Sequence, residues 1–180
     1  MTSQQELTDE RNSRFMALLD PVYRDCQRWA YTLTGNGVDA EDVLEEGILT
    51  ALKSIHQLKN DDAFKTWMFR ILTTTWRMQL RSRKTPVEML EPGELDRQAP
   101  GKPGDEVRNE TAELVHSALA RLAPEQRMAL ELFELHELSI REVANVMGKA
   151  ETAVRVQLHR ARSRMAEMLR EAGLDPGDVE

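Results

Sequence analysis

The side chains that could do chemistry gather towards the end of the chain, and most of them are arginines. Residues 149–170 contain six Lys or Arg residues but only two acids, Glu151 and Glu167. A guanidinium group binds phosphate or donates two hydrogen bonds to a guanine base, and it is not a nucleophile or a general base. These residue types favour binding to a nucleic acid over catalysis.

Residues suited to a catalytic or metal centre are sparse. Cys26 is the single cysteine, and the four histidines never occur in ligand-like pairs; they are His56, His116, His136 and His159. The sequence has neither a nucleophile spaced for pairing with a base nor a glycine-rich phosphate loop. We therefore expect a protein that is not an enzyme and that has no metal, no cofactor and no small-molecule substrate.

Composition predicts an all-α protein of the cytoplasm. Charged residues make up 31% of the 180 residues and aromatic residues 5%, and Leu, Ala, Met, Glu and Arg dominate, which favours helix over sheet. No apolar run approaches the roughly 20 residues that span a bilayer. Residues 1–10 are polar and acidic and lack the apolar centre of a signal peptide. We therefore expect no membrane insertion.

Charge is unevenly distributed along the chain. The net charge of −7 argues against a nucleic-acid partner, yet residues 65–84 contain six Lys or Arg residues and no acid. The acids gather in residues 39–46, in residues 88–113 and after Glu171. Two basic surfaces separated by acidic ones are expected, and the acidic total would suppress nonspecific DNA binding.

Apolar periodicity predicts three helices in the first half of the chain. Asp20-Pro21 is typical of a helix start, and Gly35 is expected to end that helix. Asp39 is expected to cap a second helix. A polar loop at residues 59–62 leads into a third helix that begins near Phe64. These helices can close one small core.

The segment 86–104 has four prolines, three glycines and no apolar period, which predicts a flexible acidic linker. The expected organisation is two small helical domains, at residues 1–85 and 105–172, followed by an acidic, solvated tail at residues 173–180.

The second domain contains the pattern of a helix-turn-helix. Residues 139–142, Ser-Ile-Arg-Glu, form a capping box that predicts a helix start, and Gly148 is placed to end this short helix in a left-handed conformation. A longer helix follows, with Val154 and Leu158 on its buried side. This geometry places a second helix in the major groove of DNA.

The opposite face of that longer helix presents Arg155, His159 and Arg162, flanked by Thr152 and Arg160. These side chains can bind bases or phosphates. The alternative is a solvated surface of an amphipathic helix, and the capped helix and glycine turn before it favour DNA binding.

Several motifs resemble the extracytoplasmic-function (ECF) sigma factors of bacterial RNA polymerase. Residues 119–127 (LARLAPEQR), 138–144 (LSIREVA) and 154–162 (VRVQLHRAR) are similar to sigma domain four. Residues 39–46 (DAEDVLEE) and 64–71 (FKTWMFRI) are similar to sigma domain two. Both motifs occur in the family's order, with the linker between them.

The resemblance implies three sets of binding residues. Domain two would dock on core RNA polymerase with Asp39, Glu41, Asp42, Glu45 and Glu46. It would hold the melted minus-ten element with Lys59, Asn60, Asp61, Asp62, Phe64, Lys65, Trp67, Arg70, Thr74, Arg77 and Arg81. Domain four would bind the minus-thirty-five duplex with Arg127, Ser139, Arg141, Thr152, Arg155, Val156, His159, Arg160 and Arg162. Core packing is the alternative role for Phe64 and Trp67, and stabilisation of a helix start is the alternative for Asp39.

The sequence also departs from the family pattern. The family's Ala-x-Asn followed by Asp is replaced by Leu72-Thr73-Thr74 and Met78, and its Gly-Thr-Val is replaced by residues 152–154, Thr-Ala-Val. The resemblance therefore implies docking on promoter DNA without defining which bases are read.

The expected function is that of a sigma factor, with core RNA polymerase, promoter DNA and an anti-sigma protein as partners. Two alternatives stay open. A conventional helix-turn-helix regulator would not need the acidic segment 39–46, and a sigma-like decoy that binds only an anti-sigma protein would not need the basic faces.

Overall fold

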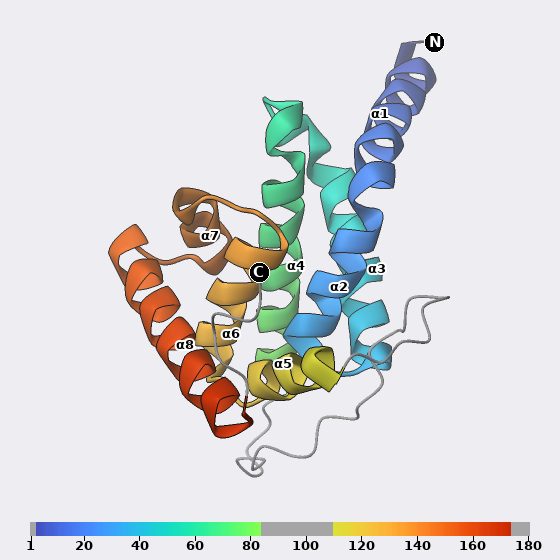
Figure 1. Cartoon of the computed structure of the whole chain (residues 1–180). Coiled ribbons are helices and arrows are strands. Elements are labelled where there is room, and N and C mark those ends of the chain that lie inside the picture. The colour runs from blue at the N-terminus through green and yellow to red at the C-terminus, as the bar shows by residue number, and fades with distance from the viewer. Residues whose placement is uncertain (1–2, 84–109, 174–180) are drawn as a thin grey trace. The chain divides into compact units, whose positions relative to one another are not determined.

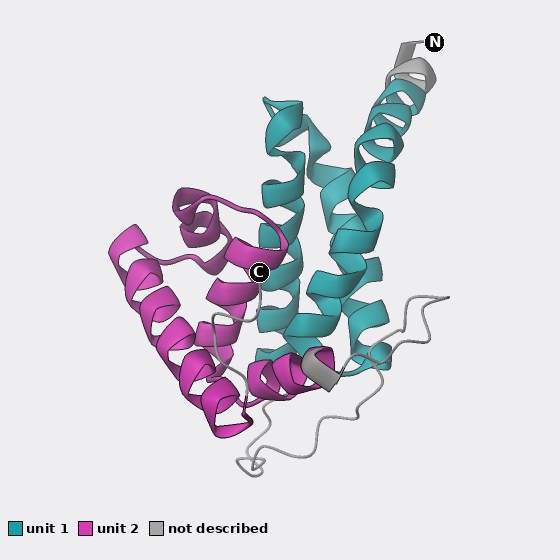
Figure 2. Ribbon diagram, viewed as in Figure 1, with its two compact units in different colours: residues 1–99 teal, residues 100–180 magenta. Residues whose placement is uncertain are grey.

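The structure is a computed structural model that describes residues 3–83 and 110–173. Every regular element in these two stretches is helical, as the composition predicts (Figure 1). The chain divides into two compact units, unit 1 at residues 1–99 and unit 2 at residues 100–180 (Figure 2). The predicted linker at residues 86–104 and all of the predicted tail except Gly173 lie outside the described residues, and each unit is considered by itself.

Unit 1 has four helices in its described part. They are α1 (Ser3–Leu19), α2 (Tyr23–Thr34), α3 (Gly37–Ser54) and α4 (Phe64–Arg83), with short 3-10 turns at Asp20–Val22, Ile55–Gln57 and Asp61–Ala63. Helices α2, α3 and α4 pack against one another, and the first turns of α1 project beyond them (Figure 1). The predicted small core is therefore present.

The core of unit 1 is built around Trp29 of α2. Its ring stacks on Phe69 of α4 with 5.7 Å between ring centroids, and its Nε1 donates a hydrogen bond of 3.1 Å to the Thr73 hydroxyl. All three side chains are fully buried. Gly47 of α3 allows the close approach of α4, because a Cβ atom there would lie 2.5 Å from Leu72 Cδ2.

The predicted start of the first helix is wrong. Asp20 lies in a 3-10 turn that follows α1, and α2 begins at Tyr23 without a side-chain cap. The sequence did not predict α1, because the polar residues at its start have no apolar period. Gly35 does end α2, with φ at 77° as expected.

The expected cap of α3 is also wrong. Asn36 is the N-cap residue, and its side chain accepts a hydrogen bond of 2.9 Å from the backbone N–H of Asp39. Asp39 therefore lies inside the first turn of α3, with Arg83 and Asn36 as its partners.

Unit 2 contains the predicted helix-turn-helix. Its described helices are α5 (Glu110–Ala120), α6 (Pro124–Leu130), α7 (Ile140–Met147) and α8 (Glu151–Glu171), and α6 continues as a π-helical turn at Glu131–Leu135. The capping box between Ser139 and Glu142 is confirmed, and so is the left-handed Gly148 at φ 66°. Leu132, Val143, Met147, Val154, Leu158 and Ala161 form the centre of the core.

Across residues 3–83 and 110–173, no helix combines the length and apolar character needed to cross a membrane. In the same part of the chain, no three His, Cys, Asp or Glu side chains are grouped so that they could hold a metal ion.

Candidate nucleic-acid interface

One face of α8 is an exposed stripe of polar and cationic side chains that includes one apolar residue, Val156. Its members follow the spacing of one helical face, and they are Thr152, Arg155, Val156, His159, Arg160 and Ser163. Val154, Leu158 and Ala161 are buried on the other side. We call this set the α8 stripe. Because α7 precedes it through the Gly148 turn, α8 occupies the position that the recognition helix has in a helix-turn-helix motif.

The cations of the α8 stripe are available to a ligand. The Arg155 side chain is 62% exposed and lies 3.9 Å from Glu151, at the outer limit of an ion pair. Arg160, and Arg141 at the start of α7, are exposed and form no ion pair with any described residue. Guanidinium groups that are exposed and lack a close ion-pair partner can reach a base edge or a phosphate.

Three residues predicted to bind DNA are engaged inside unit 2. Arg162 donates from Nη2 and Nε to Glu134, at 2.6 and 3.1 Å, and its guanidinium lies 5.2 Å from the ring centre of Phe133. Arg127 is 18% exposed and lies 3.7 Å from Glu131. The Ser139 hydroxyl donates to the Glu142 carboxylate at 2.7 Å as part of the capping box. These contacts give each of them a structural role.

A shallow hollow of about 410 Å³ adjoins the α8 stripe. Its cationic lining comes from Arg160 and Arg164 of α8 and from Arg121 in the turn before α6. Glu167 pairs with Arg164 at 3.1 Å, whereas the side chain of Arg121 has no partner among the described residues. Sequence reasoning missed Arg121 because it is far from α8 in the chain, although it lies within the motif at residues 119–127.

The exposed side of α3 carries four carboxylates between two apolar side chains. Glu41, Asp42, Glu45 and Glu46 are exposed on one face, with Val38, 74% exposed, and Leu49, 57% exposed, at its two ends; we call this set the α3 stripe. An exposed acidic surface with apolar ends fits a basic protein partner.

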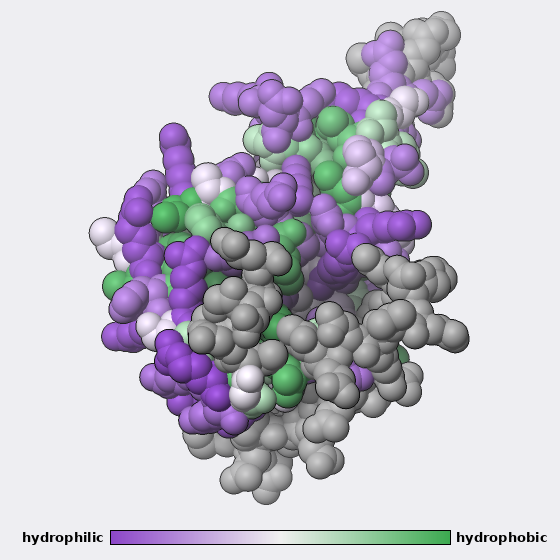
Figure 3. Space-filling view, in the orientation of Figure 1, coloured by the Kyte–Doolittle hydropathy of each residue, from purple (hydrophilic) through white to green (hydrophobic). Residues whose placement is uncertain are grey.

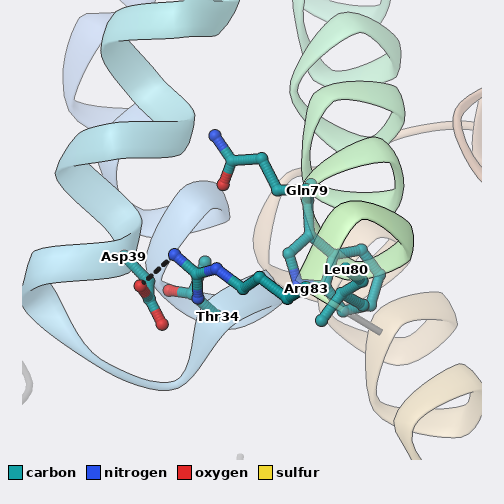
Figure 4. A pocket seen from close by; sticks show the side chains of 6 residues that line it. Thr34, Asp39, Gln79, Leu80 and Arg83 are labelled. Atoms are coloured by element: carbon teal, nitrogen blue, oxygen red, sulfur yellow. Dashed lines mark hydrogen bonds and ion pairs between the residues drawn. The ribbon is translucent and has the colours of Figure 1, made fainter. Parts of the chain in front are cut away.

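Asp39 does not belong to this exposed set. Its carboxylate accepts a hydrogen bond of 2.7 Å from Nη2 of Arg83, and the Asn36 side chain donates to it at 2.9 Å. The hydrogen bond from Arg83, followed by that from Asn36, holds the pKa of Asp39 below its ordinary value. Figure 4 shows Arg83 of α4 reaching to the start of α3 beside a cavity of about 50 Å³.

The aromatic residues at the start of α4 lie mainly in the core. Phe64 is buried and meets Phe15 of α1 edge to face, with ring centroids 5.8 Å apart. Trp67 is half-buried, and its ring centre lies 5.9 Å from that of Phe64. The alternative of core packing is thus confirmed for Phe64.

The other predicted minus-ten residues differ in their surroundings. Lys65 is ion-paired with Asp25 of α2 at 2.9 Å and lies 5.8 Å from the ring centre of Phe69. Arg70, Thr74 and Arg81 are exposed, and Arg77 is half-buried. In the loop before α4, Lys59, Asn60, Asp61 and Asp62 are exposed.

Hydrophilic side chains cover most of the described surface on the face drawn in Figure 3, with only small apolar areas between them. Partners of such a surface are recognised mainly through charge and hydrogen bonds.

Comparison with known proteins identifies both units. The Sigma-70 region 2 model matches residues 18–85, and the Sigma-70, region 4 model matches residues 112–165. Among solved structures, the sigma factor RpoE in complex with the anti-sigma factor NepR from Bartonella quintana has a similar fold. Its TM-score is 0.69 at 22% identity, over 87% of this chain and 96% of that one.

Two curated relatives come from Mycobacterium tuberculosis. The ECF RNA polymerase sigma factor SigG is 30% identical over 187 residues, which cover 91% of this chain and 50% of SigG. The chain thus spans half the length of that relative. The ECF RNA polymerase sigma factor SigM is 32% identical over 151 residues, which cover 82% of this chain and 72% of SigM. The chain belongs to the ECF family of RNA polymerase sigma factors.

Proposed function

We propose that this protein binds core RNA polymerase through unit 1 and directs initiation at promoters that unit 2 recognises. The protein would act as a binding factor of the cytoplasm, and the polymerase would supply the chemistry. The observation that carries the proposal is that one chain combines a helix-turn-helix bearing the cationic α8 stripe with a separate acidic α3 stripe.

Unit 2 would dock on the minus-thirty-five duplex with α8 in the major groove. Residues at the start of such a helix meet base edges, which assigns that part to Thr152, Arg155 and Val156. Arg160 and Arg121 would bind the phosphate backbone, because both line the hollow beside the stripe. The exposed methyl groups of Val156 suit contact with a thymine methyl group.

Unit 1 would bind core polymerase through the α3 stripe. Four exposed carboxylates would meet a basic surface, while Val38 and Leu49 would add apolar contact at the ends. Asp39 is assigned a structural role instead, because its carboxylate is bound by Arg83 and Asn36.

Minus-ten DNA would be held by unit 1 along α4 and the loop before it. Arg70, Thr74 and Arg81 are exposed on α4 and suit contact with the backbone of an unpaired strand. Arg77 stays in this predicted set, whereas Lys65 would act mainly by fixing α4 to Asp25.

An anti-sigma protein is a further expected partner. The RpoE structure with a similar fold was solved with an anti-sigma factor bound. A partner that covered the α3 stripe would compete with core polymerase for the same carboxylates. The two rival functions are distinguishable, because a conventional regulator needs no α3 stripe and a decoy needs no α8 stripe.

The proposal is tested by comigration of the full chain with sigma-free core polymerase. Glu41→Lys together with Asp42→Lys should weaken core binding and spare binding to duplex DNA, because the change lies on α3. Glu10→Lys reverses one charge at an exposed acid of α1, outside the α3 stripe; as a control it should leave core binding unchanged, whereas Glu41→Lys alone should already weaken it. If the wild-type chain does not comigrate with core, the proposal fails.

A further inference from the structure

Helix α1 is fastened to the loop that precedes α4. Arg14 donates a hydrogen bond of 3.1 Å from Nη2 to the carbonyl oxygen of Leu58, and its Nε and Nη2 both bind the carboxylate of Asp61. The Nε contact measures 3.2 Å. One guanidinium group therefore ties together two points of the 58–63 loop, which lie three residues apart.

The next residue of α1 secures the end of the same loop. Phe15 is 1% exposed and Phe64 is 2% exposed, and their rings meet edge to face. Phe64 begins α4 directly after the loop. Arg14 and Phe15 thus fix the loop from its first residue to its junction with the helix.

The loop also has hydrogen bonds of its own. The Asn60 side chain accepts from the backbone N–H of Asp62 at 3.0 Å, and the Asn60 carbonyl accepts from Ala63 N–H at 3.1 Å. The side chains of Lys59 and Asp62 are exposed and have no partner among the described residues. Asn60 and Asp61 therefore build the loop, and Lys59 and Asp62 face outward from it.

We infer that Arg14 is a positioning residue for minus-ten recognition: it holds the 58–63 loop so that Lys59 and Asp62 meet the DNA. The inference rests on the proposed function. Arg14 touches the loop and not the reading side chains, so it acts through the loop's conformation. A loop fixed in advance loses less conformational entropy on binding and discriminates better between related ligands.

The test compares Arg14→Ala with Arg11→Ala, an exposed arginine one turn earlier in α1 that has no partner among the described residues. Each full-length variant is combined with sigma-free core polymerase and a template pool randomised over the minus-ten region. Preference is measured as the ratio of enriched to disfavoured minus-ten sequences among the transcripts. Amide hydrogen exchange of residues 58–63 is measured in parallel.

Arg14→Ala should lower the preference ratio about threefold to fivefold, the scale expected for an ion pair whose side chains are 41% and 52% exposed. It should speed exchange of the Asp62 and Ala63 amides and leave exchange in α8 unchanged. Arg11→Ala should match the wild type in both readouts. Arg14→Lys should recover part of the preference, because a lysine can pair with Asp61 but lacks the fork that reaches Leu58.

Failure of the inference is distinguishable from failure of the proposed function. If the wild type initiates and Arg14→Ala keeps the wild-type preference ratio, the inference is overturned and the proposed function stands. Faster loop exchange with an unchanged ratio overturns it as well, because Arg14 would then have a purely structural role. If the wild type initiates at no template, both fall.

Discussion

Helices α4 and α8 both carry many cations, and they differ in where those cations are directed. In α4, Lys65 pairs with Asp25 and Arg83 pairs with Asp39, so both ends of the helix are joined to neighbouring helices. In the α8 stripe, Arg160 has no partner among the described residues and Arg155 has only a distant one. The cations at the two ends of α4 thus help to build unit 1, whereas Arg155 and Arg160 of α8 are exposed to solvent.

This comparison shows that the cations of a segment without acids can still form ion pairs, because other helices supply the carboxylates. Residues 65–84 contain no acid, yet α2 and α3 supply the carboxylates that meet them. Helix α8 shows the opposite case. It contains two acids, Glu151 and Glu167, yet the side chain of Arg160 is exposed and has no ion-pair partner among the described residues.

The largest effect is expected on DNA binding from the α8 stripe. Arg155→Ala together with Arg160→Ala should weaken binding to a minus-thirty-five duplex by on the order of a hundredfold, since the base contact of Arg155 is worth about 1–3 kcal/mol and the phosphate contact of Arg160 adds to it. Both side chains are exposed, so the melting temperature of the protein should hardly change. Fluorescence anisotropy with a labelled duplex measures the effect.

The control is Lys65→Ala in α4, which should leave duplex binding unchanged. A comparable loss of duplex binding from Lys65→Ala would break the contrast between the two helices, and so would wild-type affinity in the α8 double variant.

The next effect concerns a buried threonine of α4 and an exposed one of α8. Thr73→Val removes the hydroxyl that accepts from Trp29 in the core, and it should destabilise the protein by about 1–2 kcal/mol. Thr152→Val on the α8 stripe should change stability by less than about 0.5 kcal/mol. Urea unfolding measures the change in stability for both variants. Equal destabilisation by the two substitutions would contradict the difference between a buried threonine of α4 and an exposed one of α8.

A smaller effect is expected from Arg121, the residue of the hollow that sequence reasoning missed. Arg121→Ala should weaken duplex binding about threefold to fivefold, equally for all sequences, and lower the salt slope of log K by about one. Arg170→Ala, an exposed arginine of α8 outside the hollow, is the control. An unchanged salt slope in Arg121→Ala would remove Arg121 from the interface.

The smallest effect is the pH-dependent contribution of the Asp39–Arg83 ion pair to the free energy of unfolding. Because the folded pKa of Asp39 lies below its ordinary value of 3.8, the pair stabilises the fold above that value, and the contribution is lost as pH falls through the folded pKa. Asp39→Asn should therefore cost less than about 1 kcal/mol at pH 7. The difference from wild type should vanish in strong acid, as measured by urea unfolding.

Arg83→Gln removes the other partner and should reproduce this behaviour. If the unfolding free energy of either variant differed from that of the wild type by the same amount at all pH values, the proposed role of the ion pair would be contradicted.

Local chemistry explains what could be predicted from the sequence. The capping box at Ser139 and the left-handed Gly148 involve neighbouring residues, so the pattern itself contains the physical cause. The same holds for the buried face of α2 and for its end at Gly35. The helix-turn-helix and the exposed α8 stripe followed from these signals.

Contacts between distant residues explain what could not be predicted. Arg162 lies on the predicted DNA-binding face by spacing, yet Glu134, 28 residues away, binds its guanidinium. Helix α1 has no apolar period in the sequence, and Phe15 and Leu19 are the only buried side chains among its described residues 8–19. The Arg14 contact with Asp61 joins residues 47 apart and has no sequence signature.

The most direct test of the central claim is in-vitro transcription with sigma-free core polymerase and a promoter template pool. We expect the chain to produce specific transcripts whose templates share two conserved elements, one near minus thirty-five and one near minus ten. Loss of the minus-thirty-five element with Arg155→Ala and Arg160→Ala would agree with the assigned roles. No initiation at any template, together with no comigration with core, would contradict the account.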